Sequence, residues 1–311
     1  MNRLIISPLR YPGSKHRLVS YIQQALKLNN LNPQLYIEPF VGGASIALGL
    51  MQAEQVNKVI LMDIDPWVAS FWEVLFFDTD WLVDQIRNIP VTLEYWNKFK
   101  NGTHLDKRTQ ALSCLFLNRT SFSGILEKAV GPLGGKEQKS QYSIDCRFPR
   151  ETLVQRVSGI ARHREKIYGV WNCSWEEGIT RIRVDQQQKK LPSRELFFYF
   201  DPPFFEKANK LYRFFFQEDD HKRLRDFVLA LEDNWLLSYD SAKQVEQLYG
   251  DAIHKKTNGA NRHHVDIYYS ISVMSERKMA KEVIISNLPI LPDPNFNIKN
   301  VHSGHNQPKL L

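Results

Sequence analysis

Cysteine is scarce in this chain of 311 residues, which has only Cys114, Cys146 and Cys173 and no Cys-x-x-Cys pair. An odd number of cysteines without that spacing predicts neither a disulfide framework nor a zinc site, and it favours a reducing compartment. The chain also lacks any apolar run of about 18 residues, the length that a membrane-spanning helix needs. Residues 1–8 contain no long apolar stretch followed by a small-residue cleavage site. We therefore expect a cytoplasmic protein that neither is secreted nor binds a membrane.

Negative charge is not in excess either. The formal net charge is +7 and the pI is near 9.2, which favours a polyanionic partner. Residues 131–195 hold thirteen Lys/Arg against eight Asp/Glu. Most of the positive imbalance therefore precedes the apolar segment that begins at Leu196.

The first quarter of the chain alternates between strand and helix patterns. Residues 17–28 have apolar side chains at helical spacing, and residues 35–37 form a short apolar run that ends at Glu38. A glycine turn (39–43), a buried helix (44–51), a strand (58–62) that ends at Asp63, and an apolar helix (67–77) follow. This order predicts an α/β fold, a doubly wound, mostly parallel sheet of the Rossmann-like type.

The strand and helix rhythm stops at about residue 78 and resumes at Leu196. We expect helices at 81–86 and 108–117, a glycine-rich basic loop or hairpin at 131–149, and a surface loop at 185–190. A helix is predicted at 218–233 and further strands at 235–238, 267–273 and 282–285. The predicted domains are a catalytic domain (1–77 and 196–291), an inserted, mainly helical lobe (78–195) and a mobile polar tail (292–311).

The segment LFFYFDPPFF, which starts at Leu196, carries the most chemical information. An apolar run that stops at Asp201 is typical of a buried parallel strand whose carboxyl end opens into a crevice. Pro202 and Pro203 stiffen the loop and remove two donors while their carbonyls remain acceptors. A carboxylate, a fixed carbonyl and the ring of Phe204 would suit an exocyclic amino group on a flat base.

A second candidate site lies in the segment EPFVGGAS, from Glu38 to Ser45. Gly42 and Gly43 allow a ligand to approach the backbone, and the following helix start has free N–H groups. Asp63 ends the next strand about twenty residues later, where an acid commonly binds ribose hydroxyls. The acid before the turn would repel a pyrophosphate but attract the cationic end of S-adenosylmethionine. The pattern favours a nucleoside methyl donor over NAD.

The segment RYPGSK, from Arg10 to Lys15, precedes the first predicted helix. Its Gly-Ser turn and lysine could hold a carboxylate or a phosphate. The segment is too short for a Walker loop.

Taken in order, these segments resemble the Dam-like, D12 class of DNA N6-adenine methyltransferases over about residues 7–290. RYPGSK is similar to the N-terminal element of that family, EPFVGGAS to its cofactor motif, and DPPF to its D-P-P-Y motif. LNRTSFSG, from Leu117 to Gly124, is similar to the family element L-N-R-x-x-x-N-G, and SERKMAKEVIISN (275–287) to the closing segment. The resemblance departs at Phe204, where the family has Tyr, and at Ser123, where it has Asn.

The resemblance implies a site-specific DNA methyltransferase that transfers a methyl group from S-adenosyl-L-methionine to adenine N6, leaving S-adenosyl-L-homocysteine. It implies that the adenine is flipped out of double-stranded DNA and methylated by direct transfer. The residues assigned to catalysis are Asp201, Pro202, Pro203 and Phe204. Those assigned to the cofactor are Tyr11, Lys15, Glu38, Pro39, Phe40, Gly42, Asp63 and Asp201. We expect no metal ion in the reaction.

Candidates for DNA contacts come from the inserted lobe and its basic loop. They are Asn118, Arg119, Ser123, Lys136, Lys139, Arg147 and Arg150. The expected partners are double-stranded DNA, through which the protein would associate with the nucleoid, and a cognate restriction or defence protein.

Two alternatives stay open at this point. One is an amino-group methyltransferase that acts on cytosine N4, RNA or protein. The other is a non-catalytic DNA-binding subunit that keeps the fold, with Phe204 in place of Tyr as its sign.

Overall fold

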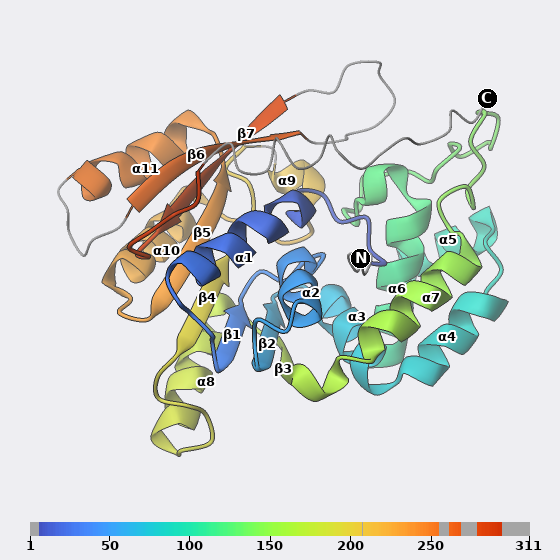
Figure 1. Cartoon of the computed structure of the whole chain (residues 1–311). Coiled ribbons are helices and arrows are strands. Elements are labelled where there is room, and N and C mark those ends of the chain that lie inside the picture. The colour runs from blue at the N-terminus through green and yellow to red at the C-terminus, as the bar shows by residue number, and fades with distance from the viewer. Residues whose placement is uncertain (1–5, 207, 255–260, 269–278, 294–311) are drawn as a thin grey trace, which may run out of the picture.

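A mixed seven-stranded sheet forms the centre of the molecule in the computed structural model, which describes residues 6–206, 208–254, 261–268 and 279–293. The strand order is β3-β2-β1-β4-β5-β7-β6 (Figure 1). The strands are β1 (Leu35–Glu38), β2 (Lys58–Asp63), β3 (Ile167–Asn172), β4 (Leu196–Phe200), β5 (Asn234–Asp240), β6 (Asn261–Tyr268) and β7 (Met279–Ser286). The first five pair in parallel and β7 runs antiparallel to both neighbours. The predicted doubly wound, mostly parallel α/β fold is confirmed.

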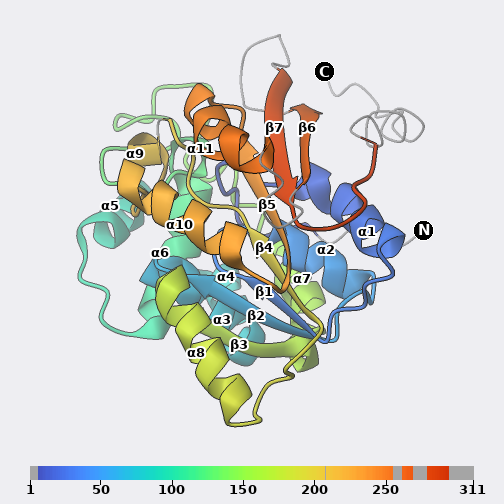
Figure 2. The same cartoon turned by 90° about the vertical axis from the view of Figure 1, so that its left-hand side faces the viewer.

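Helices cover both faces of this sheet (Figure 2). They are α1 (Val19–Leu28), α2 (Ser45–Gln52), α3 (Pro66–Phe77), α4 (Thr79–Asn88), α5 (Leu93–Asn101), α6 (Lys107–Thr120), α7 (Arg150–Ala161), α8 (Trp175–Gln187), α9 (Ala208–Leu211), α10 (Glu218–Ala230) and α11 (Lys243–His254). Short 3₁₀ turns occur at His16–Leu18, Phe122–Gly124 and Arg164–Lys166. No helix of the described ranges is both long and apolar enough to cross a membrane.

The strands are apolar at nearly every position because alternate residues pack under different helix layers. In β4, Phe197 and Tyr199 belong to the core shared with α1, α2 and α3. Phe198 and Phe200 belong to the core shared with α8, α10 and α11. This double burial explains why the run before Asp201 shows no alternation of apolar and polar residues.

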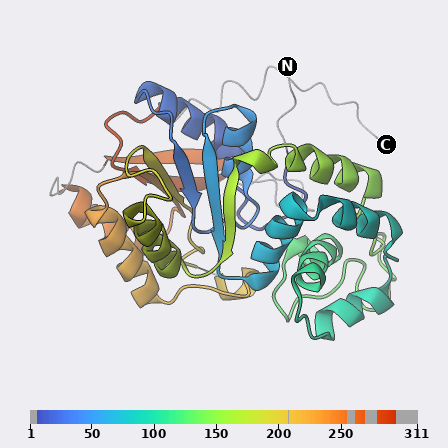
Figure 3. The same ribbon diagram turned by 90° about the horizontal axis from the view of Figure 1, so that it is seen from below.

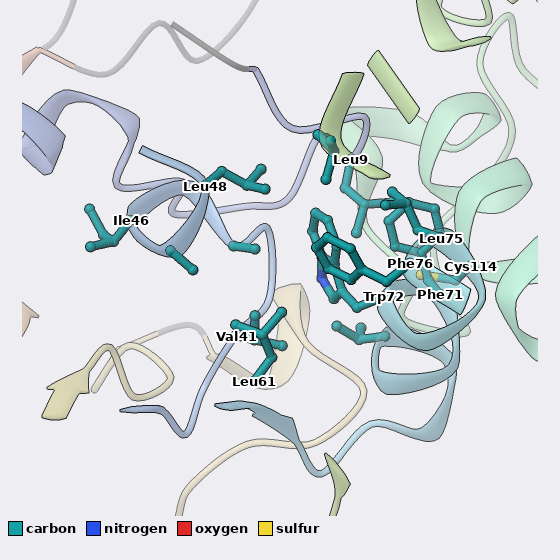
Figure 4. Packing of buried hydrophobic residues seen from close by; sticks show 14 of the residues in the cluster. Leu9, Val41, Ile46, Leu48, Leu61, Phe71, Trp72, Leu75, Phe76 and Cys114 are labelled. Carbon is teal, nitrogen blue, oxygen red and sulfur yellow. The ribbon is translucent and has the colours of Figure 1, made fainter. Parts of the chain in front are cut away.

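Helix α3 joins the sheet to the group of helices α4–α7 beside β3 (Figure 3). Phe71, Trp72, Leu75 and Phe76 of α3 are buried in the same core as Cys114 of α6 (Figure 4). The helix starts sharply because the Asp65 side chain accepts a hydrogen bond from the N–H of Trp67, with Pro66 in the first turn. The helical lobe therefore shares its core with one face of the sheet.

Strand β3 and helix α8 differ from the sequence prediction. Both lie in the range 78–195 that we placed outside the sheet, yet β3 is the edge strand paired with β2. The part of this range outside the sheet therefore ends before Ile167. The strand was missed because an edge position leaves four of its six residues at least partly exposed, so no apolar run marks it.

Other elements also differ from the sequence prediction. Helices α5 and α7 were not predicted, and α8 extends into the polar stretch that we expected to be a loop. Strand β6 begins at Asn261, earlier than the predicted strand at 267–273, of which residues 269–273 lie outside the described residues. Most of the predicted tail (294–311) and the start of the closing segment (275–278) also lie outside them.

Two helical glycines give a paired test of how tightly α1 packs on α2. A Cβ atom built on Gly49 of α2 would lie 2.3 Å from Cγ1 of Val19, whereas one on Gly159 of α7 meets nothing within 4 Å. We expect Gly49→Ala to lower the free energy of unfolding by about 1–3 kcal/mol because it overpacks this contact. Gly159→Ala should raise it by up to about 1 kcal/mol because alanine favours the helix. Urea unfolding of both variants checks this, and stabilisation by Gly49→Ala would contradict the packing.

Candidate functional site

A pocket lies where the carboxyl ends of β1, β2 and β4 meet. Glu38 and Asp63 end the first two strands and Asp201 follows the third, so parallel pairing brings three distant carboxyl groups to one edge of the sheet. The pocket is lined by residues 11–15, Glu38, 40–46, 63–65, Tyr199, 201–203 and 212–214. All the cofactor residues predicted from the sequence line it except Pro39, which is buried behind it.

The turn between β1 and α2 has an unusual backbone. Gly42 has φ of +40° and Ala44 has φ of +52°, a left-handed value that is uncommon for a residue with a side chain. A Cβ atom on Gly42 would lie 2.7 Å from Cε1 of Tyr11, so only glycine allows the tyrosine ring to lie against the turn. The indole N–H of Trp72 donates to the Gly42 carbonyl at 2.8 Å and fixes the turn to α3.

The carboxyl group of Asp63 joins this turn to the end of β2. Its Oδ2 accepts from the N–H of Gly42 at 3.0 Å and its Oδ1 from the N–H of Asp65 at 2.9 Å. Burial, reinforced by the charge of Asp65, raises the pKa of Asp63 to about 7, and these two hydrogen bonds oppose the shift.

Glu38 is buried at the other wall of the turn. Its Oε2 accepts from the hydroxyl of Tyr36 at 2.8 Å and from the N–H of Ala47 at 3.0 Å. Burial raises the pKa of Glu38 to about 8, with the Tyr36 bond opposing and the charge of Asp201 adding to the shift. Two buried carboxyl groups suit a ligand with hydroxyl donors. A cationic ligand would lower their raised pKa values and favour their ionised forms, whereas a pyrophosphate would raise these pKa values further.

Lys15 and Asp201 form the buried ion pair of the site. The Nζ atom of Lys15 lies 2.8 Å from Oδ1 of Asp201 and 3.6 Å from Oε1 of Glu282 on β7, and it donates to the Gly13 carbonyl at 3.1 Å. Ser238 of β5 donates to the same Oδ1 at 3.1 Å, and the hydroxyl of Tyr199 lies 2.8 Å from Ser238 Oγ. Burial raises the pKa of Asp201, while Lys15 and Ser238 lower it.

Phe204 lies beyond the ion pair and outside the pocket lining. A Cβ atom on Gly13, which has φ of +75°, would lie 2.8 Å from Cζ of Phe204. The Nζ atom of Lys15 lies 5.2 Å from the centroid of the Phe204 ring. Pro202 is buried and Pro203 and Phe204 are half-buried, so the loop after β4 holds the ring against the N-terminal segment.

Residues after this loop cross the pocket, and the sequence analysis missed them. The ring of Tyr212 stacks on Tyr11 with centroids 5.9 Å apart. Nη1 of Arg213 lies 2.8 Å from Oδ1 of Asp65, and its guanidinium lies 3.8 Å from the centroid of the Trp67 ring. The aromatic run LYRFFF (211–216), which begins eight residues after the Asp-Pro-Pro motif, was the available signal.

Ser238 and Glu282 were also missed. They lie on β5 and β7, whose places in the sheet bring them to Lys15 and Asp201. Both were seen only as members of apolar strands.

The predicted DNA contacts fall into two groups in the structure. Lys136, Lys139 and Arg147 are exposed, and Ser123 is half-buried with φ of +54°. Lys139 lies 2.6 Å from Oε2 of Glu137. These side chains remain available to a ligand, although Lys139 already has an acidic neighbour.

The other three predicted DNA contacts have structural partners. Asn118 is fully buried, accepting from the N–H of Arg10 at 2.6 Å and donating to the Gly124 carbonyl at 2.7 Å. Arg150 donates to the carbonyls of Ile86, Arg87 and Ile89 at the end of α4. Arg119 is buried, and its Nε donates to the Pro8 carbonyl at 2.6 Å. Asn118 and Arg150 thus make hydrogen bonds within the protein, and their contacts with DNA stay a prediction.

The raised pKa values of Glu38 and Asp63 predict how stability depends on pH. Each group binds a proton more tightly in the folded chain, so the stability it contributes is fully present below its unfolded pKa, near 4.5 for Glu38. This contribution is lost as the pH rises toward about 7 for Asp63 and about 8 for Glu38. The free energy of unfolding should therefore fall between pH 4.5 and pH 8.

Glu38→Gln should make this fall shallower because the amide keeps an acceptor oxygen and has no proton to lose. Urea unfolding at several pH values measures the slope, with the exposed Glu94→Gln of α5 as the matched control. Equal slopes for Glu38→Gln and the wild type would show that Glu38 is already ionised in the folded protein.

Comparisons with known proteins agree with this geometry. Residues 11–129 match the sequence model of the family described as D12 class N6 adenine-specific DNA methyltransferase. The chain is also 25% identical over 252 residues to the Type II methyltransferase M.MjaIII of Methanocaldococcus jannaschii, an alignment that covers 72% of this chain and 79% of the relative. The matched range contains residues 11–15 of the N-terminal segment, the turn after β1 and Asp63. Over residues 11–129 the chain is thus similar to the D12 class of N6 adenine-specific DNA methyltransferases.

Proposed function

We propose that this DNA adenine methyltransferase uses S-adenosylmethionine to methylate N6 of an adenine flipped out of a specific double-stranded site. The proposal rests on the hydrogen-bond partners of the two carboxylate oxygens of Asp201. Its Oδ1 is held by Lys15 and Ser238, and among the described residues no hydrogen bond reaches its Oδ2. The side chain keeps 20% of its surface exposed at the edge of the pocket. One oxygen is thus fixed while the other is free to accept from a substrate.

The pocket residues fit the cofactor proposed for this reaction. The carboxyl group of Asp63 can accept from ribose hydroxyls, and the left-handed turn at Gly42 and Ala44 lets the backbone approach a ligand. Glu38 and Asp201 would ionise beside the cationic amino group and the sulfonium, because a neighbouring positive charge lowers the pKa of a carboxyl group. The rings of Tyr11 and Phe40 provide apolar walls. When bound, S-adenosylmethionine supplies an activated methyl group.

The residues at the acceptor side orient the base. Asp201 Oδ2 and the Pro202 carbonyl would accept from the two N6–H groups, so that the N6 lone pair is aimed into the pocket. The ring of Phe204 would stack on the adenine, which offsets part of the cost of unstacking it from the duplex. Lys15 lowers the pKa of Asp201 against the effect of burial and so favours the ionised carboxylate, the stronger acceptor. Direct transfer then needs no nucleophile from the protein.

The helical lobe is the proposed target-recognition part. Its helices α4–α7, with the loop between α6 and α7, contain the exposed basic residues Lys136, Lys139 and Arg147. These residues are proposed to contact the DNA backbone. The relative's description as a Type II methyltransferase makes a cognate restriction endonuclease the partner to test for.

Transfer of labelled methyl groups to unmethylated genomic DNA tests the reaction. The wild type should form N6-methyladenine, and Asp201→Ala should lose at least about 100-fold in rate because it removes both the acceptor and its charge. Asp201→Asn is the matched control: it keeps an acceptor oxygen and should retain more activity than Asp201→Ala. No label in DNA, with cofactor binding intact, would reject the proposal and point to cytosine N4, RNA, protein or a binding-only subunit.

Phe204 gives a separate test of base stacking. Phe204→Ala should lower kcat/KM by about 5- to 150-fold, the equivalent of about 1–3 kcal/mol for a lost base stack. Phe204→Tyr restores the ring and should change the rate only modestly, which also separates an active enzyme from a non-catalytic subunit. A rate for Phe204→Ala equal to that of the wild type would show that the ring does not hold the base.

A further inference from the structure

The N-terminal segment passes between the helical lobe and the sheet (Figure 1). Four arginines lie close to one another around this segment. Arg119 Nε donates to the Pro8 carbonyl at 2.6 Å, and Arg156 Nη1 donates to the Ser7 carbonyl at 3.3 Å. Arg119 Nη1 lies 3.5 Å from the carbonyl oxygen of Arg147, and Arg10 belongs to the segment itself. We call Arg10, Arg119, Arg147 and Arg156 the arginine cluster.

The arginine cluster has more donors than the protein satisfies. Arg119 is only 5% exposed, yet its Nη2 has no hydrogen-bond partner, and neither does the buried Nη1 of Arg10. No carboxylate of the described ranges forms an ion pair with any of the four. Burying a charged donor without a partner is costly, so this arrangement points to an anion that the protein itself does not provide.

The charges within the cluster act on one another. Burial lowers the pKa of Arg119, and the neighbouring charges of Arg156, Arg10 and Arg147 lower it further. Burial and Arg147 likewise lower the pKa of Arg10. Because guanidinium groups stay protonated at neutral pH, this repulsion persists until an anion is bound.

The arginine cluster is partly exposed to solvent. Arg147 is exposed, and Arg10 and Arg156 are half-buried, whereas Arg119 forms the floor. Tyr11, the neighbour of Arg10, lines the pocket of the proposed reaction. An extended anion that enters the cluster would therefore continue toward the site of methyl transfer.

We propose that the arginine cluster binds one phosphodiester of the DNA strand beside the target adenine. This rests on the proposed function and deepens it, because it assigns a phosphate contact to Arg10 and Arg156, which sequence analysis did not select, and to Arg119 and Arg147. The planar guanidinium groups offer several donors to the same phosphate oxygens. Phosphate contacts of this kind position the duplex without reading its sequence.

The test measures DNA affinity as a function of salt, with the full chain and without turnover. Arg147→Gln and Arg156→Gln are made singly and together, whereas Arg119 is kept because its loss would release the segment at Pro8. Loss of one phosphate contact should reduce the slope of log affinity against log salt by about 0.9 in the double variant. The affinity near physiological salt should fall about 10-fold, equally for DNA with and without the methylated site.

Arg194→Gln is the matched control, since it removes an exposed positive charge from the loop before β4, at the opposite edge of the sheet. It should leave the slope unchanged. An unchanged slope in the double variant would overturn the proposal, and so would a loss restricted to the methylated sequence, which would indicate base reading.

A second measurement, with inorganic phosphate, distinguishes a site for a DNA phosphodiester from a site for free phosphate. If the cluster were a site for free phosphate, millimolar phosphate would raise the Tm of the wild type and not of the double variant, while the salt slope for DNA stayed the same in both. That result would overturn the proposal. Absence of methyl transfer by the wild type would instead reject the proposed function, because the salt slope does not depend on turnover.

Discussion

The ion pair between Lys15 and Asp201 is the interaction on which the site depends. Lys15 belongs to the N-terminal segment and Asp201 to the end of β4, and Ser238 and Glu282 bring in β5 and β7. A buried carboxylate without this partner would take up a proton and become a weaker acceptor. The same contact therefore joins four segments and favours the ionised form of the carboxyl group at the edge proposed to bind the base.

Geometry at this edge follows from parallel pairing. Because β1, β2 and β4 run in the same direction and are adjacent in the sheet, their last residues reach the same crevice. Two glycines around them place backbone where a side chain would collide: Gly42 makes room for Tyr11, and Gly13 makes room for Phe204. Each of these two glycines thus allows one close contact between the backbone and an aromatic ring.

Prediction from the sequence worked best for strands that are buried on both faces and that end in an acidic residue. β1, β2 and β4 were located within a residue or two, and Glu38, Asp63 and Asp201 were named as a set that the structure places around one pocket. It failed for β3, because an exposed edge strand has little apolar periodicity. It also missed Arg213 and Ser238, whose relevance comes only from neighbours more than 35 residues away in sequence. Such contacts depend on strand order, which composition does not encode.

The basic residues show the same limit in a different form. Counting charge pointed to residues 131–195, yet Arg150 caps α4 and Lys139 lies beside Glu137. The four arginines of the arginine cluster form no ion pair within the described residues, and they come from the N-terminal segment, α6, the loop before α7, and α7 itself. What makes an arginine available to an anion is the absence of a local partner, and that is a property of the fold.

The N-terminal segment connects the two charged regions. Arg10 is fixed to the lobe through Asn118, Tyr11 lies against the turn at Gly42, and Lys15 pairs with Asp201. A backbone only six residues long thus runs from the arginine cluster to the acidic pocket, from a region of positive charge to one of negative charge. Under the two proposals, a phosphodiester bound at the first and a cationic methyl donor bound at the second would lie on either side of this segment, so its position would determine how the base approaches the methyl group.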